Sequence, residues 1–139
     1  MNPILKMILA VLGGLISAIA AALLLWPVVQ LVFDKFFEFG SSRSDIILRL
    51  SFYLWVLIPT LVGGFVCSLI AARKELNHVL VLTLLTIAIM IVIFREDIVT
   101  IEPRDTLIIL MFPLGYFTGG RIGMTYKRKR KKRLEKTIS

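Results

Sequence analysis

Four long apolar stretches constrain the fold of this chain more than any other feature. A hydrocarbon core of about 30 Å requires about 20 helical residues to cross it. Four stretches reach or approach that length, at residues 4–33, 50–72, 79–94 and 106–123. Apolar side chains make up 58% of the residues and the mean hydropathy is +0.87, which excludes a soluble enzyme and a disordered chain. The sequence therefore predicts an all-α, four-transmembrane-helix bundle.

The first stretch also has features of a cleaved signal peptide. Ala18-Ile19-Ala20 follows a basic residue and an apolar run, in the order that such peptides show. The chain stays apolar through Phe33, however, so cleavage would create an apolar new N-terminus. We therefore expect a retained span that tilts or bends near Pro27, because it is longer than a bilayer requires.

Lysine and arginine are distributed unevenly between the two ends of the predicted spans. With four spans both termini share one side, which carries twelve basic residues: Lys6, Arg73, Lys74, Arg121 and the eight between Lys127 and Lys136. The opposite side carries five: Lys35, Arg43, Arg49, Arg95 and Arg104. Because the excess normally lies on the cytoplasmic side, we expect both termini in the cytoplasm.

This topology assigns the remaining residues to loops and a tail. The predicted outer loops are Asp34–Arg49 and Arg95–Asp105, and the inner loop Arg73–His78 is short enough to make the second and third spans antiparallel neighbours. We expect residues 1–126 to form the bundle and residues 127–139 to form a separate cytoplasmic polybasic tail.

Small residues recur at four-residue spacing in three of the four spans, where they allow helices in lipid to approach closely. We predict tight contacts among the first, second and fourth spans and looser packing of the third, which has no glycine. The faces either pack the monomer or dock a partner or a second copy. The candidate packing residues are Gly13, Gly14, Ser17, Gly63, Gly64, Ser68, Gly115, Gly119 and Gly123.

The second and fourth spans share an order of features. Pro59 precedes Gly63-Gly64, and Pro113 precedes Gly119-Gly120, each followed by basic residues. A duplicated helical hairpin would explain this order, and so would independent use of the same kink and packing residues.

The stretch from Gly63 to Ala72, the pair Asn77-His78 and the glycine-rich end at Gly115–Gly123 also support a resemblance. Together they resemble small, uncharacterised four-helix bacterial integral membrane proteins with glycine-rich spans. The resemblance covers mainly the second and fourth spans. It implies a fold class and no chemistry.

The span interiors lack the residues on which most membrane chemistry depends. They contain no Asp, Glu, Lys, Arg or His, so proton-coupled transport is disfavoured. The chain has one cysteine, Cys67, and one histidine, His78, which offer neither a metal-ligand set nor a nucleophile–base pair. We therefore expect no enzyme activity, no metal and no cofactor.

Aromatic residues gather at the outer ends of the first two spans, around Trp26 and Trp55. Tryptophan favours the headgroup level, and we expect Asp34–Phe39 to lie along the membrane surface as a short interfacial segment. These aromatic residues either anchor the protein or form a docking surface for another membrane subunit.

A run of seven basic residues follows the last span directly. Such a run binds anionic lipid when it adjoins a membrane helix, and in soluble proteins it serves as a nuclear signal or a nucleic-acid arm. Its position favours anionic lipid at the cytoplasmic face, with ribosome or RNA contact as the alternative and no DNA partner expected. The predicted headgroup-binding residues are Lys127, Arg128, Lys129, Arg130, Lys131, Lys132 and Arg133.

These features together favour a non-enzymatic accessory or structural subunit of a larger membrane assembly. We place it in the bacterial cytoplasmic membrane, in contact with other membrane subunits or with copies of itself. The alternative is a small homo-oligomeric channel or carrier whose pathway forms between protomers.

Overall fold

A computed structural model describes residues 2–37, 42–71, 75–93 and 106–138 of the chain. The described residues form four α-helices: α1 (Pro3–Phe37), α2 (Ser42–Ile70), α3 (Glu75–Ile93) and α4 (Thr106–Ile138). Each is long and apolar enough to cross a membrane. Within these described ranges, the predictions of an all-α fold and of four helices able to span a membrane are confirmed.

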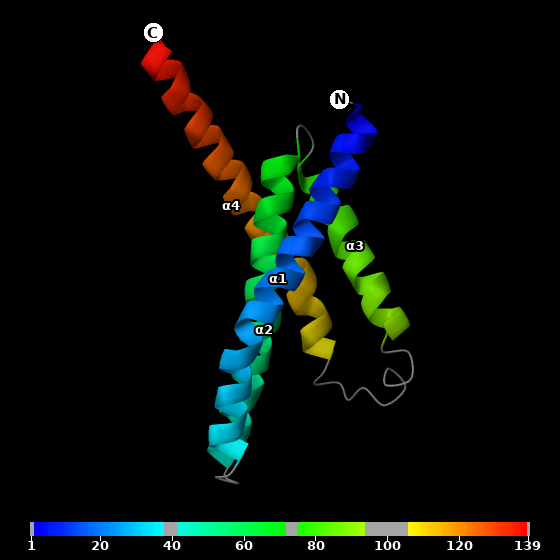
Figure 1. The fold of residues 1–139 in the computed structure, drawn as a ribbon, viewed down its shortest axis with the longest axis vertical. Coiled ribbons are helices and arrows are strands. Elements are labelled where there is room, and N and C mark those ends of the chain that lie inside the picture. Colours follow the sequence, from blue (N-terminus) through cyan, green and yellow to red (C-terminus); the bar gives the residue numbers. More distant parts are fainter. Residues whose placement is uncertain (1, 38–41, 72–74, 94–105, 139) are drawn as a thin grey trace.

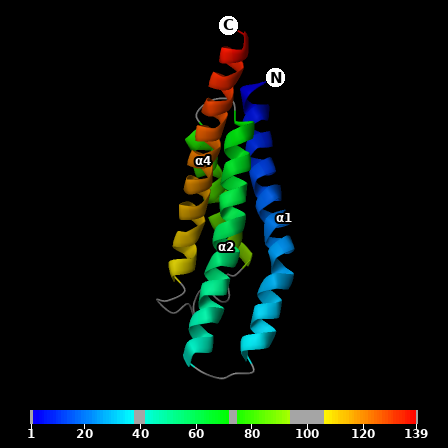
Figure 2. The same ribbon diagram turned by 90° about the vertical axis from the view of Figure 1, so that its left-hand side faces the viewer.

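Helix α2 lies between α1 and α4 and has extensive contacts with both (Figures 1 and 2). Helix α3 packs mainly against α4 and touches α1 and α2 less. The predicted α2–α3 neighbourhood is therefore present, but α4 is the main support of α3. The N- and C-termini lie at the same end of the molecule (Figure 2).

The hairpin of α1 and α2 is longer than predicted. Helix α1 runs to Phe37 and α2 begins at Ser42, so most of the predicted Asp34–Arg49 loop and the first part of the predicted interfacial segment are helical. Isolated charges such as Lys35 do not end a helix, although they suggested a loop in the sequence. Residues 38–41 and the predicted loop Arg95–Asp105 lie outside the described residues.

Helix α4 also continues beyond its predicted end. It passes Gly123 and runs through the expected separate tail to Ile138. The residues after Gly123 include no Gly or Pro and are rich in Lys, Arg, Leu and Glu, which favour helix. The polybasic run is thus a helical extension of the fourth span.

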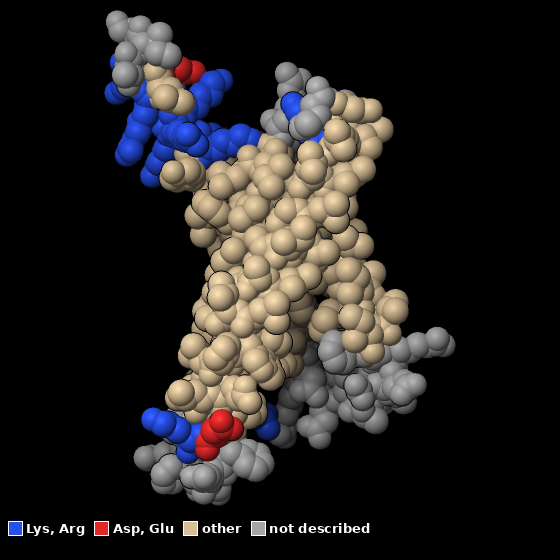
Figure 3. All heavy atoms as spheres, in the orientation of Figure 1, with Lys and Arg blue, Asp and Glu red and all other residues tan. Residues whose placement is uncertain are grey.

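The helices bury little and expose a broad apolar surface. In the most apolar window of α2, 39% of the residues are buried, against 22% for both α1 and α3. The third span was expected to pack more loosely than the other three, and it does bury a smaller share than α2 and α4. Helix α1 buries as small a share as α3, because it packs almost wholly on one side, against α2. In Figure 3 an uncharged belt separates charged residues at the two ends, as a surrounding bilayer requires.

Candidate functional site

The first candidate surface is the contact between α1 and α2, where two backbones meet. A Cβ atom on Gly63 would lie 2.7 Å from the carbonyl oxygen of Gly14, and one on Gly14 would lie 2.9 Å from that of Gly63. Gly13 faces only the flexible end of Ile70, at 2.6 Å. The Ser17 hydroxyl donates to carbonyl oxygens of its own helix, at 2.8 and 3.0 Å.

The contact between α2 and α4 uses a row of glycines on α4. Side chains at these positions would collide with groups of α2, because the helices are in direct contact there. Gly115 faces Thr60, Gly119 faces the carbonyl of Leu61, and Gly123 faces the Ser68 hydroxyl. The Ser68 hydroxyl itself donates to the carbonyl of Phe65, at 2.8 Å.

Tyr116 connects three helices and was not singled out from the sequence. It is 1% exposed, and its backbone packs directly on Gly64 of α2. Its hydroxyl lies 3.1 Å from that of Thr86 on α3, which also donates to the carbonyl of Leu82 at 2.9 Å. Since a hydroxyl has one proton, Tyr116 then donates to Thr86. In the sequence, its position beside Gly115 was the feature that could have indicated a place in a helix contact.

The predicted packing glycines and Ser68 therefore lie in contacts between helices of this one chain, whereas the Ser17 hydroxyl bonds within α1. The three spans with small-residue faces make the two closest contacts, α1–α2 and α2–α4, while α1 and α4 have little contact with each other. Helix α3 approaches this group through Val79, which lies against Gly120.

The second candidate surface is the part of the α1–α2 hairpin that we expect on the outer side of the membrane. We call it the outer arm and define it as residues 25–37 of α1 and 42–58 of α2. Its tip extends past the described ends of α3 and α4 (Figures 1 and 2). The Trp55 indole N–H donates to the carbonyl of Ala22 at 3.0 Å, and the rings of Trp26 and Trp55 lie 5.4 Å apart. Pro27 lacks the N–H that would bond to the carbonyl of Leu23, yet α1 continues through it to Phe37.

Two open grooves flank the contact between α1 and α2 in the outer arm, and Val29 lines both. One groove, of about 210 Å³, is also lined by Trp26, Gln30, Phe33 and Phe52. The other, of about 240 Å³, includes Val28 and Trp55 among its lining residues. Gln30 is exposed and makes no hydrogen bond to another described side chain or backbone group through its amide.

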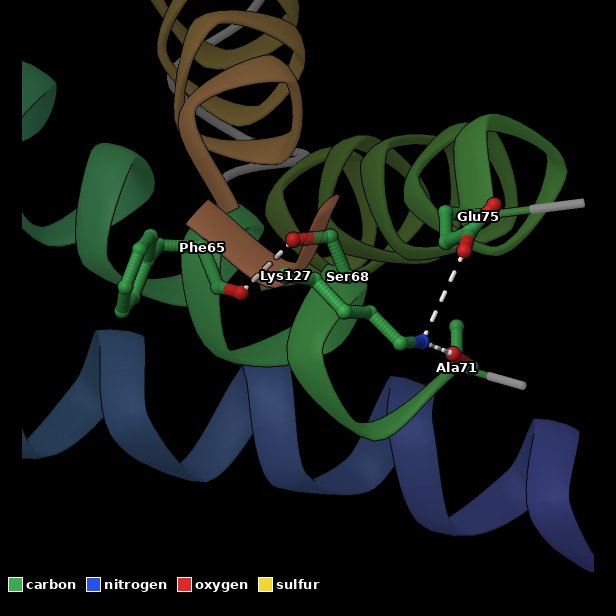
Figure 4. Close-up of polar contacts among 5 residues, drawn as sticks. All are labelled: Phe65, Ser68, Ala71, Glu75 and Lys127. Atoms are coloured by element: carbon green, nitrogen blue, oxygen red, sulfur yellow. Dashed lines mark hydrogen bonds and ion pairs between the residues drawn. The ribbon is translucent and has the colours of Figure 1, made fainter. Parts of the chain in front are cut away.

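The third candidate surface lies at the end of the molecule that holds both termini. Lys127 points back into the bundle, where its Nζ donates to the carbonyl of Ala71 and lies 3.5 Å from Glu75 Oε1 (Figure 4). Ala71 directly follows α2, whose last carbonyls lack helical partners and carry partial negative charge. Lys127 therefore joins the end of α2 to the beginning of α3, and its side chain is only 38% exposed.

The six residues after Lys127 form what we call the basic collar, Arg128–Arg133. All six are exposed, and successive residues of an α-helix are rotated by about 100°. Their positive charge therefore surrounds α4, and Figure 3 shows the basic side chains on the side that faces the viewer. Lys131 lies 3.8 Å from Glu135, but both side chains are well exposed, so this pair contributes little to stability.

Residues with catalytic or metal-binding chemistry do not gather in the described ranges. No group of three or more His, Cys, Asp and Glu residues there is close enough to hold a metal ion. Cys67 is a free thiol at 0% exposure between α1 and α2, and His78 lies in the first turns of α3.

The surfaces that the structure offers are thus two internal glycine contacts, an apolar arm and a basic helical end. Searches of protein-family models, curated proteins and solved structures find no match to this chain.

Proposed function

We propose that this protein is a non-enzymatic accessory subunit of a larger assembly in the bacterial cytoplasmic membrane, with both termini in the cytoplasm. The outer arm is the observation that carries this proposal, because it offers an open apolar groove on each side of the α1–α2 contact. The excess of basic residues at the end with both termini supports the orientation.

The length of the arm favours a protein neighbour over lipid alone. At 1.5 Å per residue, the 35 residues of α1 extend about 52 Å, whereas the 19 residues of α3 extend about 28 Å. A core of about 30 Å suits α3, and an ordinary tilt of about 20° shortens α1 only slightly. Apolar residues near the tip of the arm, such as Ile46, which is 60% exposed, would then extend beyond the hydrocarbon. Exposed apolar patches of this kind mark protein contacts.

Gln30 distinguishes a partner helix from an acyl chain as the occupant of its groove. Its amide can both donate and accept a hydrogen bond, and it lies among apolar and aromatic side chains. An acyl chain cannot form a hydrogen bond with the amide N–H or the amide oxygen. A polar side chain on a transmembrane helix can, and such a hydrogen bond stabilises the contact by about 0.6–2 kcal/mol. The proposed occupant is therefore a transmembrane helix of a partner subunit.

The alternative, a homo-oligomeric channel or carrier, has less support from the described residues. The hydroxyls that would supply its polar pathway are buried within the chain, and they bond to carbonyls of their own helices. The glycine faces that would join protomers already hold α1, α2 and α4 together. A duplicated hairpin is likewise little supported, since the α1–α2 contact is far more extensive than the α3–α4 contact.

A photo-crosslinking pair in the native membrane tests the proposal. Phe33, which lines the Gln30 groove, and Ile89 in α3 are 36% and 37% exposed, so a benzoylphenylalanine at each position is about equally accessible. We expect the probe at Phe33 to join one discrete second polypeptide, and the probe at Ile89 to join mainly lipid. Gln30→Leu should reduce the Phe33 product. A product containing a second copy of this chain would favour the channel, and lipid products alone at Phe33 would refute the partner proposal.

A further inference from the structure

The basic collar is attached rigidly to the bundle. Helix α4 is unbroken from Thr106 to Ile138, and Lys127 bonds to the end of α2 immediately before the collar begins. The ring of Tyr126 also lies 6.2 Å from that of Phe65 on α2. The collar thus has a fixed height relative to the membrane spans, unlike a flexible basic tail.

The height of the basic collar along α4 coincides with the headgroup layer. From Leu107 to Tyr126 the helix rises about 30 Å, which matches the hydrocarbon core. The exposed Arg121 lies about 8 Å before Tyr126 along the helix, so its long side chain can reach the headgroups. The collar then occupies about 8 Å of helix, against a headgroup layer of about 5–7 Å. The end of α4 leans away from the N-terminal end of α1 (Figure 1), which keeps the collar closer to the membrane than an upright helix would.

The distribution of charge around the helix indicates how the collar meets its ligand. A helix that lies flat on a membrane, or in a nucleic-acid groove, uses one basic face and has a different opposite face. The collar has no such second face, because its six consecutive basic residues surround the helix. A helix that passes through a layer of anionic groups meets them on every side, and charge on every side suits that passage.

We propose that the basic collar is a binding site for anionic phospholipid headgroups, which surround α4 as it leaves the membrane. Lys127 has a separate positioning role: it holds the collar at this level through Ala71 and Glu75, and contributes little to lipid binding because its ammonium group is already engaged. This inference does not depend on the accessory-subunit proposal. It requires only that α4 crosses the membrane.

Mobility of the helix end tests the site directly. A spin label on Ser139→Cys, in a Cys67→Ala background, is followed in phosphatidylcholine liposomes with increasing phosphatidylglycerol. We expect phosphatidylglycerol to slow the label, because headgroups bound around the collar restrain the motion of the last turns of α4. High salt should restore the mobility, because at about 1 M salt screening shortens to about 3 Å. A label equally mobile in both lipids would overturn the proposal. A label that is slowed in neutral liposomes by added RNA, and not by phosphatidylglycerol, would identify a nucleic-acid surface instead.

A matched pair of charge variants separates binding from positioning. Lys129→Gln removes a collar charge. The lipid midpoint, which is the fraction of phosphatidylglycerol at which half of the labels are slowed, should therefore rise about fivefold, equivalent to about 1 kcal/mol. The unfolding temperature of this variant in neutral lipid should not change. Lys127→Gln removes the same charge but should lower that unfolding temperature and shift the lipid midpoint less. If Lys127→Gln shifted the lipid midpoint as much as Lys129→Gln and left stability unchanged, the positioning role would be wrong.

Discussion

Helices α2 and α3 are both apolar and both able to span a membrane, but they are held in different ways. Helix α2 is in close backbone contact on two sides, with Gly14 of α1 and with the glycine row of α4. Helix α3 has no glycine and packs one face, through residues such as Val79, Leu82 and Thr86. In lipid, where apolar burial alone does not drive association, small residues therefore determine which helix becomes the centre of the bundle.

The largest expected effect comes from enlarging a residue at the centre of the α2–α4 contact. Gly64→Leu places a side chain against the backbone of Tyr116, which cannot move without separating the helices. We expect about 3 kcal/mol of destabilisation, at the upper end of the usual cost of overpacking, measured as the free energy of unfolding in mixed micelles. The control is Ala88→Leu on the exposed face of α3, expected within about 0.5 kcal/mol. A greater loss at Ala88 would reverse the comparison.

A smaller change distinguishes two adjacent glycines of α1. A methyl group on Gly14 would meet the carbonyl of Gly63 and the side chains of Cys67 and Leu82, all within 2.9 Å. Gly14→Ala should therefore cost about 1–2 kcal/mol. Gly13→Ala meets only the flexible end of Ile70, and alanine favours helix by about 1 kcal/mol, so its net effect should be near zero. Equal losses at both positions would show that contact with the α2 backbone does not decide the cost.

The smallest expected effect concerns the hydrogen bond between α4 and α3. Tyr116→Phe removes the hydroxyl that donates to Thr86, but Thr86 keeps its bond to the Leu82 carbonyl. We expect a loss of about 0.6 kcal/mol in the same unfolding measurement, the average for such bonds in membrane helices. A loss several times larger would mean that α3 depends mainly on this bond.

The sequence predicted the four helices and the small residues of the contacts because both depend on local composition. It did not predict the partner of each face, since spacing shows that a face is small but not which helix meets it. Tyr116 and Lys127 were missed as links between helices for this reason. Their partners, Thr86 and Ala71, are distant in sequence.

Helix ends were also predicted poorly where charges occur near a span. Lys35 and Arg49 suggested a loop, and Lys127–Arg133 suggested a separate tail, yet both regions are helical. Charge indicates where a chain meets water but does not by itself end a helix. The sequence therefore located the spans better than it located the ends of the helices.

The central place of α2 also has a consequence for the order of events during synthesis. Its face for α1 can be covered as soon as α2 enters the membrane, because α1 is already made. Its other face stays open until Gly115, Gly119 and Gly123 have been added. At about 5–20 residues per second, the chain from Ile70 to Gly123 takes roughly three to ten seconds. During that interval the nascent chain presents a small-residue surface that any neighbouring helix can occupy, and timely arrival of α4 determines whether the native bundle closes.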